Sequence, residues 1–442
     1  QLFHKDLPTL VKALDVPVKA VMLKGRKNYL CLTRMNWLIS DSNTLNANEI
    51  EALIPIVFWM YWTKTGDISE CSGFFNARKD WLKSLICSDT GFCTGGICNK
   101  NDGCFYGRLK KSIFHSQLVV VNHSLLLTDL VQKGLLPEYD SVIIDEAHNL
   151  VKSAYDQFKI EWSEQQVSYQ LQSLDPSFPR SIRWNNILQS MNKINPDIGE
   201  QRENLVKAVG ATRDCLKNLM DTLADEHERK FNPDDSYQVQ PILKNISKEY
   251  APQKRDIALM KSNLEEVLFI FDRIKKLVLE IDKTRTDYPI LHSTLDQGIE
   301  KAHGLIDILV LLTENQDPGW VYWMEGKYKK STKSNDRLVL SLYAIMIDVS
   351  NILSRNFFEK NNSCILTSAT LKIQNSFDYF LNRVGLNDIG YVKTREYLSP
   401  FYYNDQVSYY QYGGSKEISN NPEMLGEVIY NIHRKYNKRM MV

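Results

Sequence analysis

Two adjacent carboxylates, Asp145 and Glu146, directly follow a short apolar run, and His148 comes soon after them. The run predicts a buried parallel strand, and open α/β sheets bind ligands beyond the carboxyl ends of such strands. There, Asp145 can hold Mg²⁺, and Glu146 can orient or deprotonate a water that attacks the γ-phosphate of ATP. His148 can link that site to a neighbouring domain by a hydrogen bond. The structural alternative is a pair of acids at a helix N-terminus, where the helix dipole favours them.

A second strand, predicted over residues 363–366, ends in the small residues Thr367, Ser368, Ala369 and Thr370. Their hydroxyls can bond a carboxylate or a neighbouring domain, and they can relay the state of a bound nucleotide. The pattern is weak by itself, but it gains weight in a chain that also carries two adjacent carboxylates after a strand. We therefore expect this segment to couple the nucleotide site to movement.

Cysteines cluster in a loop that is rich in Gly, Asn and Asp and packs poorly without a ligand. Cys93, Cys98 and Cys104 lie close together in it, which favours a soft metal ion or a cluster. An iron–sulfur cluster takes four cysteine ligands, and either the nearby Cys87 or the distant Cys31 could be the fourth. Zinc is the chemical alternative, although its ligands are usually spaced more closely. Reduced thiols without a ligand are the structural alternative.

The composition limits the class of protein. A chain of 442 residues exceeds one hydrophobic core, so about two to four domains are expected. Its 43% hydrophobic and 24% charged residues are those of a globular protein, and the net charge of +1 gives no global signal for nucleic acid. No apolar run approaches the roughly 20 residues of a membrane span, and no signal peptide opens the chain. We expect a cytoplasmic protein without a membrane partner, whose nucleic-acid binding depends on local grooves.

The apolar patterns place the candidate residues on an α/β framework. Strands are predicted over residues 19–23, over 118–121 and before Asp145, and a helix between the last two completes a βαβ unit. This unit indicates a doubly wound parallel sheet. Residues 151–317 show long helical periodicities and few strand signals, which predict a helical insertion.

Further elements flank this framework. A helix over residues 48–62 ends in an aromatic run that we expect to pack in a core rather than to stack on bases. Pro8 and Pro55 are expected to interrupt the helices that contain them. The remaining predicted elements are helices over 1–14, 105–115 and 424–436, and two strands, 320–325 and 337–342, around a basic loop.

A phosphate-binding loop of the form Gly-x-x-x-x-Gly-Lys-Ser/Thr does not occur in the sequence. A magnesium-binding carboxylate cannot support hydrolysis without such a loop. The chain begins inside a predicted helix and stops in a predicted strand. We therefore expect a central fragment of a longer protein, with the phosphate loop upstream of Gln1.

Together these segments resemble one family, the XPD-like helicases of superfamily 2, and most closely the bacterial DinG type. Residues 145–148 are similar to the Walker B, or DEAH, box of that superfamily. The other matching segments occur in family order along nearly the whole chain, at residues 1–8, 24–31, 65–67, 104–106, 119–123, 367–371 and 399–401. The arginine-bearing motifs of the family's second RecA-like domain are absent from the sequence.

The resemblance implies an ATP-dependent 5′-to-3′ DNA helicase that acts in DNA repair or replication. The implied fold is a RecA-like doubly wound parallel sheet, of the P-loop NTPase type, with an iron–sulfur insertion and a mainly helical arch insertion. The implied domains are the first RecA-like domain (1–24, 113–150 and 363–395), the iron–sulfur domain (25–112), the arch (151–362) and a truncated second RecA-like domain (396–442).

The same resemblance implies cofactors and partners. A 4Fe–4S cluster would be held by Cys31, Cys93, Cys98 and Cys104, with Cys87 as the alternative ligand, beside ATP and Mg²⁺. Single-stranded DNA and forked or R-loop-like duplex would be the partners of a monomer that works on the bacterial nucleoid. Two other functions stay open: a non-catalytic DNA-binding scaffold, and an iron–sulfur redox or sensing protein.

Overall fold

The structure is a computed structural model, which divides into two compact units, residues 1–390 and 391–442. Within the described residues, no helix is long and apolar enough to cross a bilayer. The described residues are 2–40, 45–76, 80–88, 104–131, 134–178, 182–231, 240–281, 288–314, 316–329, 337–387, 389–399, 402 and 421–436.

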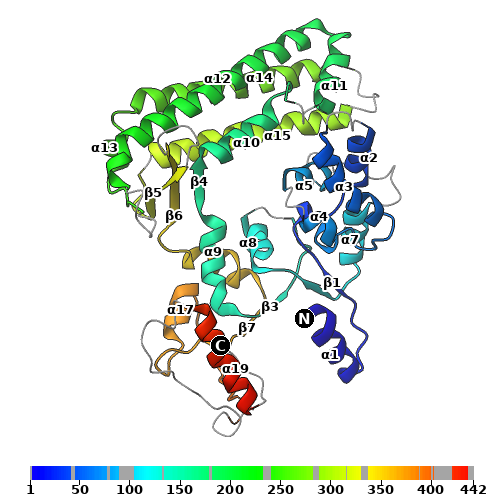
Figure 1. The fold of residues 1–442 in the computed structure, drawn as a ribbon, viewed down its shortest axis with the longest axis vertical. Helices are drawn as coiled ribbons and strands as arrows, with labels where there is room; N and C mark the ends of the chain where they lie inside the picture. Colours follow the sequence, from blue (N-terminus) through cyan, green and yellow to red (C-terminus); the bar gives the residue numbers. More distant parts are fainter. Residues whose placement is uncertain are drawn as a thin grey trace. The chain divides into compact units, whose positions relative to one another are not determined.

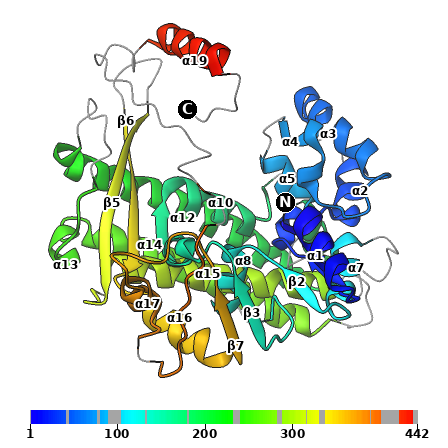
Figure 2. The ribbon, with the colours of Figure 1, turned by 90° about the horizontal axis from the view of Figure 1, so that it is seen from below.

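Two pairs of parallel strands lie in the first unit. β1 (Ala20–Met22) pairs with β2 (Leu118–Val120), and β3 (Ser141–Ile144) pairs with β7 (Ser363–Leu366), as Figure 2 shows for the second pair. Parallel strands need crossover connections, so the predicted α/β class with parallel strands is confirmed. Among the described residues, these four strands form two separate two-stranded sheets. A RecA-like sheet therefore stays a prediction.

Helices cover one face of the β3–β7 pair. The core between them includes Ile144 and residues of α8 (His123–Val131), α9 (Leu150–Phe158), α16 (Ser350–Asn356) and α17 (Asp378–Val384). The prediction of a buried strand before Asp145 is wrong in part, because Ile144 is 2% exposed but Ile143 is 66% exposed. Successive side chains of a strand point to opposite faces, and the described residues cover only the face of Ile144.

Residues 25–112, here called the cysteine-bearing segment, have a hydrophobic core of their own. It is formed around Leu30, Met35, Ile56 and Ile86. A capping box starts the central helix of this core, because the Asn46 and Glu49 side chains each accept a hydrogen bond from the other's backbone N–H. The surrounding helices, blue to cyan in Figure 1, are α2 (Leu32–Ser40), α3 (Ala47–Trp59), α4 (Ser72–Asn76), α5 (Asp80–Ile86) and α7 (Phe105–Ile113).

The aromatic run at the end of α3 does not pack as predicted. Phe58, Tyr61 and Trp62 are 67%, 77% and 82% exposed, whereas Trp59 and Met60 are half-buried against the core. Successive side chains of a helix are about 100° apart, so a short run cannot bury all its members on one side. The prediction of core packing is therefore wrong for the three exposed aromatics. Pro55 lies inside α3 and does not end it.

Three long helices form most of the predicted helical insertion. They are α12 (Pro196–His227), α14 (Lys254–Leu279) and α15 (Tyr288–Thr313), and α14 packs against both of the others (Figure 1). The predicted apolar periodicities are confirmed, since Leu216 and Leu223 of α12 and Leu264 of α14 are fully buried. Shorter helices complete the insertion: α10 (Glu164–Leu174), α11 (Ile182–Asn192) and α13 (Ile246–Glu249).

The insertion also contains a three-stranded antiparallel sheet with the order β4-β6-β5. The two predicted strands are confirmed but longer, as β5 (Trp320–Lys329) and β6 (Arg337–Met346). The third strand, β4 (Ile160–Ser163), was not predicted, because four residues give no clear periodicity. The tip of the predicted basic loop lies outside the described residues.

Both ends of the chain carry helices. The prediction of one helix over residues 1–14 is corrected to a π-helical turn, Leu2–Asp6, followed by α1 (Leu7–Leu14), with Pro8 in the first turn of α1. Proline is tolerated there because the first N–H groups of a helix have no partner within it. In the second unit, α19 (Pro422–Tyr436) confirms the predicted last helix. The predicted final strand, residues 439–442, lies outside the described residues.

Candidate functional site

The two adjacent carboxylates lie where β3 ends. Asp145 follows the last residue of the strand, and Glu146 leads into a 3₁₀ turn, Ala147–Asn149, and then into α9. The Glu146 N–H donates a 3.0 Å hydrogen bond to Asp145 Oδ1. Glu146 has a left-handed backbone, with φ of 50°, and non-glycine residues adopt this conformation mainly where the surrounding structure imposes it, often at functional sites. Both side chains are open to solvent.

The end of β7 lies directly beside these carboxylates. The Thr367 N–H donates to the Ile144 carbonyl at 2.8 Å, and the Ala147 N–H donates to the Thr367 carbonyl at 2.9 Å. These backbone hydrogen bonds extend the ladder beyond the ends of both strands. They bring the Thr367 hydroxyl next to Asp145, and Thr367 Oγ1 donates a 3.1 Å hydrogen bond to Asp145 Oδ1. The predicted contact between a small hydroxyl and a carboxylate is present.

His148 joins the two segments a second time. Its Nδ1 is 2.7 Å from Ser368 Oγ and 3.2 Å from Glu146 Oε2. The Ser368 hydroxyl also accepts a 3.3 Å hydrogen bond from the Thr370 N–H, and Ala369 lies exposed between these two residues. His148 is therefore in contact with a carboxylate on its own segment and with a hydroxyl on the other.

A further histidine belongs to this group but was not predicted as a site residue. His123 Nε2 is 2.9 Å from the Asp145 carbonyl oxygen. His123 is the first residue of α8 and stands just beyond the carboxyl end of β2. Its position after a parallel strand is the sequence signal that could have identified it.

The predicted cysteine ligands divide into two groups. Cys93 and Cys98 lie outside the described residues, whereas Cys31, Cys87 and Cys104 lie within them. The Cys87 side chain is nearly buried in the local core, with its sulfur 3.7 Å from the Ser84 carbonyl. Cys31 and Cys104 are half-buried at the edge of that core. Three metal-ligating side chains do not come together among the described residues, which hold only part of the predicted set.

Gly66 connects the segments that carry Cys31 and Cys104. Its carbonyl accepts a 2.8 Å hydrogen bond from the N–H of Leu30, which precedes Cys31. A Cβ atom on Gly66 would lie 2.2 Å from Cγ of Phe105, which follows Cys104. Because Gly66 has no side chain and has a left-handed φ of 70°, both segments can pack on it. Cys31 and Cys104, which are distant in the sequence, thus each adjoin a residue that contacts Gly66.

The chain is similar in sequence to several curated bacterial proteins. No family model matches the chain. The chain is 27% identical to the ATP-dependent DNA helicase YoaA of Haemophilus influenzae over 412 residues, which are 92% of this chain and 56% of that protein. It is 26% identical to YoaA of Escherichia coli over the same shares, and 24% identical to the 3′-5′ exonuclease DinG of Bacillus subtilis over 92% of this chain and 43% of that protein. The chain thus spans about half the length of the curated relatives it matches.

Proposed function

We propose that this chain, a relative of the DinG-like helicases, is the central part of an ATP-dependent DNA helicase. One observation carries the proposal. Two segments far apart in sequence meet at the ends of neighbouring parallel strands, through the Thr367–Asp145 and His148–Ser368 contacts. Hydroxyls beside a carboxylate pair at such strand ends suit a site that senses and hydrolyses a nucleotide. The names of the bacterial relatives supply the class of reaction.

Each residue of the group has a role in this proposal. Asp145 would hold the Mg²⁺ of Mg-ATP, which offsets charge on the transferred phosphoryl group when it is bound. The Thr367 hydroxyl orients the Asp145 carboxylate by its hydrogen bond to Oδ1. Glu146 projects into solvent, where it can align a water and accept its proton.

In this proposal, His148 links the nucleotide-bound state of the site to the segment that contains Ser368. Its Nδ1 lies within reach of both Glu146 and Ser368, so a change in the orientation of Glu146 changes the balance between these two contacts. Residues 367–370 lie on the segment that continues to the second unit. We assign this segment the task of passing the nucleotide state to the movement along DNA.

The cysteine residues support an iron–sulfur cluster as the second cofactor. Cys31 and Cys104 are half-buried and follow or precede residues that contact Gly66, whereas the Cys87 side chain is buried with its sulfur close to the Ser84 carbonyl. We therefore prefer Cys31 to Cys87 and keep the ligand set that the resemblance implies: Cys31, Cys93, Cys98 and Cys104. The Gly-rich sequence between Cys87 and Cys104 has few apolar residues, so a bound cluster would supply cross-links in place of a hydrophobic core.

The hydrophobic clusters support a domain assignment close to the one that the resemblance implies. α9 and α16 share the core of β3 and β7, so we place the arch between residues 160 and 346. The iron–sulfur domain comprises residues 25–112, and the segments around it belong to the first RecA-like domain, with the second domain starting near residue 396. The protein acts as a monomer in the bacterial cytoplasm on single-stranded DNA and on forked or R-loop-like duplex.

The proposal is tested on the complete reading frame that contains this chain. ATP hydrolysis should be stimulated by single-stranded DNA and should fall at least about a hundredfold in Glu146→Gln, because the variant cannot accept a proton from water. Partial duplexes with a 5′ or a 3′ tail test the polarity, and only the 5′-tailed duplex should be unwound. DNA binding without ATP hydrolysis in the wild type would instead identify a non-catalytic scaffold.

A further inference from the structure

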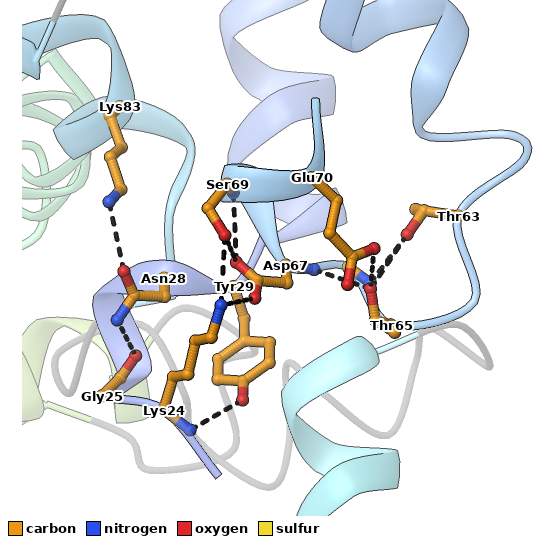
Figure 3. Close-up of polar contacts among 11 residues, drawn as sticks. Lys24, Gly25, Asn28, Tyr29, Thr63, Thr65, Asp67, Ser69, Glu70 and Lys83 are labelled. Carbon is orange, nitrogen blue, oxygen red and sulfur yellow. Dashed lines mark hydrogen bonds and ion pairs between the residues drawn. The ribbon is translucent and has the colours of Figure 1, made fainter. Parts of the chain in front are cut away.

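The Asp67 carboxylate is buried in the cysteine-bearing segment, just before the 3₁₀ turn Ile68–Glu70, and is not part of the nucleotide site (Figure 3). Asp67 is 3% exposed, and its carboxylate forms an ion pair with Lys24 Nζ. Ser69 donates to Asp67 Oδ1 twice, from its backbone N–H at 3.1 Å and from its hydroxyl at 2.8 Å. A buried charge is costly unless it is paired and hydrogen-bonded, and this one has both kinds of partner.

The network joins two segments that are distant in the sequence. The Lys24 N–H donates a 2.9 Å hydrogen bond to the Tyr29 hydroxyl, and Lys24 Nζ donates to Ser69 Oγ at 3.2 Å. The Tyr29 backbone forms an isolated antiparallel bridge with Asp67. Residues 24–29 are therefore held against residues 67–69 by both side-chain and backbone bonds.

The held segment leads directly to Cys31. The Cys31 N–H donates to the Ile86 carbonyl at 2.8 Å, and the Ser88 N–H donates to the Tyr29 carbonyl at 2.7 Å. The backbone of residues 29–31 is thus fixed between residues 66–67 on one side and 86–88 on the other. Since Phe105 packs on Gly66, the residue before Asp67, the same turn also supports the Cys104 segment.

From these contacts we infer that Asp67 is a positioning residue for the iron–sulfur cluster. Its bonds to Lys24 and Ser69 fix the turn at Gly66, and that turn fixes Cys31 and Cys104 relative to one another before the cluster binds. The inference rests on the proposed cluster, but it assigns a role that the ligands alone do not explain. A carboxylate that supports a ligand backbone in this way raises the affinity for the metal by pre-organisation.

The experiment measures iron per chain and the rate of iron loss to a chelator, with anaerobically purified full chain. Asp67→Asn removes the charge that pairs with Lys24, and iron loss should be about tenfold faster, as expected for a residue that supports metal ligands. Glu51→Gln is the matched control, because it removes an exposed carboxylate from α3, a helix that packs in the same core but lies outside the Asp67 turn. Its rate should equal that of the wild type.

Two further variants separate positioning from general loss of stability. Ser69→Ala removes one hydroxyl donor to Asp67 and one acceptor for Lys24 Nζ but keeps the Asp67–Lys24 ion pair, so it should give an intermediate rate of iron loss. Ile56→Ala lowers the stability of the same core without touching the polar network, since Ile56 is 0% exposed in that core. The electron paramagnetic resonance spectrum of the reduced cluster should change in Asp67→Asn and stay unchanged in Ile56→Ala.

The possible failures are distinguishable. If Cys31→Ser abolishes iron binding but Asp67→Asn retains iron, its wild-type spectrum and the wild-type rate of loss, the positioning role is refuted and the cluster stands. If iron loss follows only the melting temperature across all variants, Asp67 acts through stability and the inference is also refuted. If Cys31→Ser retains full iron, or the wild type binds none, the cluster assignment itself is wrong.

Discussion

The Thr367 hydroxyl donates a 3.1 Å hydrogen bond to Asp145 Oδ1 across the ends of two neighbouring strands, although 222 positions separate the two residues in the sequence. The paired strands hold this contact in place, because Ser363 to Leu366 align with Ser141 to Ile144 and the ladder continues to Thr367. The orientation of the predicted magnesium ligand is therefore determined by β7 as much as by β3.

Replacing the Thr367 hydroxyl should therefore impair the nucleotide site. In Thr367→Val, which keeps the side-chain shape, we expect DNA-stimulated ATP hydrolysis to fall about tenfold, because residues that orient metal ligands typically contribute this much. A raised magnesium requirement should accompany the loss. Thr370→Val is the matched control, since Thr370 contacts Ser368 through its backbone N–H. Equal activity of Thr367→Val and wild type across magnesium concentrations would contradict the assigned role.

His148 should couple hydrolysis to movement and contribute little to hydrolysis itself. His148→Ala removes the contacts to Ser368 and Glu146 together, so we expect unwinding to fall about tenfold more than ATP hydrolysis does. Ser368→Ala removes the hydroxyl that contacts His148 Nδ1 and leaves Glu146 in place, and it should reproduce this uncoupling. Parallel measurement of both rates on one tailed duplex tests the prediction, and a proportional fall in both rates would count against it.

Sequence patterns were sufficient for the elements that repeat a period over many residues. The long helices α12 and α14 and the strands β5 and β6 follow apolar periodicities that are visible in the sequence. β4 is too short to show a period and is stabilised by pairing with β6, which lies far away in the sequence. The exposure of Ile143 was likewise unpredictable, because it depends on which face of the strand pair is covered.

The candidate site was predictable in its residue types and less so in its contacts. The carboxylate pair and the hydroxyl segment stand out by spacing, but the choice of Ser368 as the partner of His148 follows only from the register of β3 and β7. Asp67 gave no signal of its burial, because a charged residue in a loop is normally solvated. Its environment comes from Lys24, which lies in the segment after β1 and far from Asp67 in the sequence.

The stability of the cysteine-bearing segment should depend on pH through Asp67. Burial would raise the pKa of this carboxyl, but the hydrogen bonds from Lys24 and Ser69 outweigh it and lower the pKa below the ordinary 3.8. The stabilisation is then complete above that ordinary value and is lost as the pH falls through the lower pKa of the folded state. Asp67→Asn should lower the free energy of unfolding by about 2 kcal/mol at neutral pH.

The difference in the free energy of unfolding between wild type and Asp67→Asn should stay constant from about pH 5 to pH 8 and shrink below about pH 4. Urea unfolding at a series of pH values measures it. A difference that grows as the pH falls would show that the sign of the Asp67 effect is wrong.

Two glycines of α15 should respond to alanine in opposite directions. A Cβ atom on Gly298 would lie 2.3 Å from Phe271 Cε1 of α14, whereas one on Gly304 would meet nothing within 4 Å. Gly298→Ala should therefore destabilise the chain by about 1–3 kcal/mol through overpacking. Gly304→Ala should stabilise it by about 0.5–1 kcal/mol, because alanine favours the helix. Thermal unfolding of both variants tests whether α14 and α15 approach closely at Gly298. Equal melting temperatures of the two variants would contradict this close approach.

The exposed aromatics after α3 should contribute to DNA binding. Tyr61 and Trp62 are 77% and 82% exposed, and aromatic rings in this state can stack on unpaired bases. Trp62→Ala should weaken binding of single-stranded DNA about tenfold, with little change in its dependence on salt, because stacking involves no phosphate.

Phe269→Ala on α14, where the ring is 62% exposed, is the control and should bind as the wild type does. Fluorescence anisotropy with a labelled oligonucleotide measures both affinities. An unchanged affinity of Trp62→Ala would exclude base stacking at this residue, and an equal loss in Phe269→Ala would show that the effect is not specific to this segment.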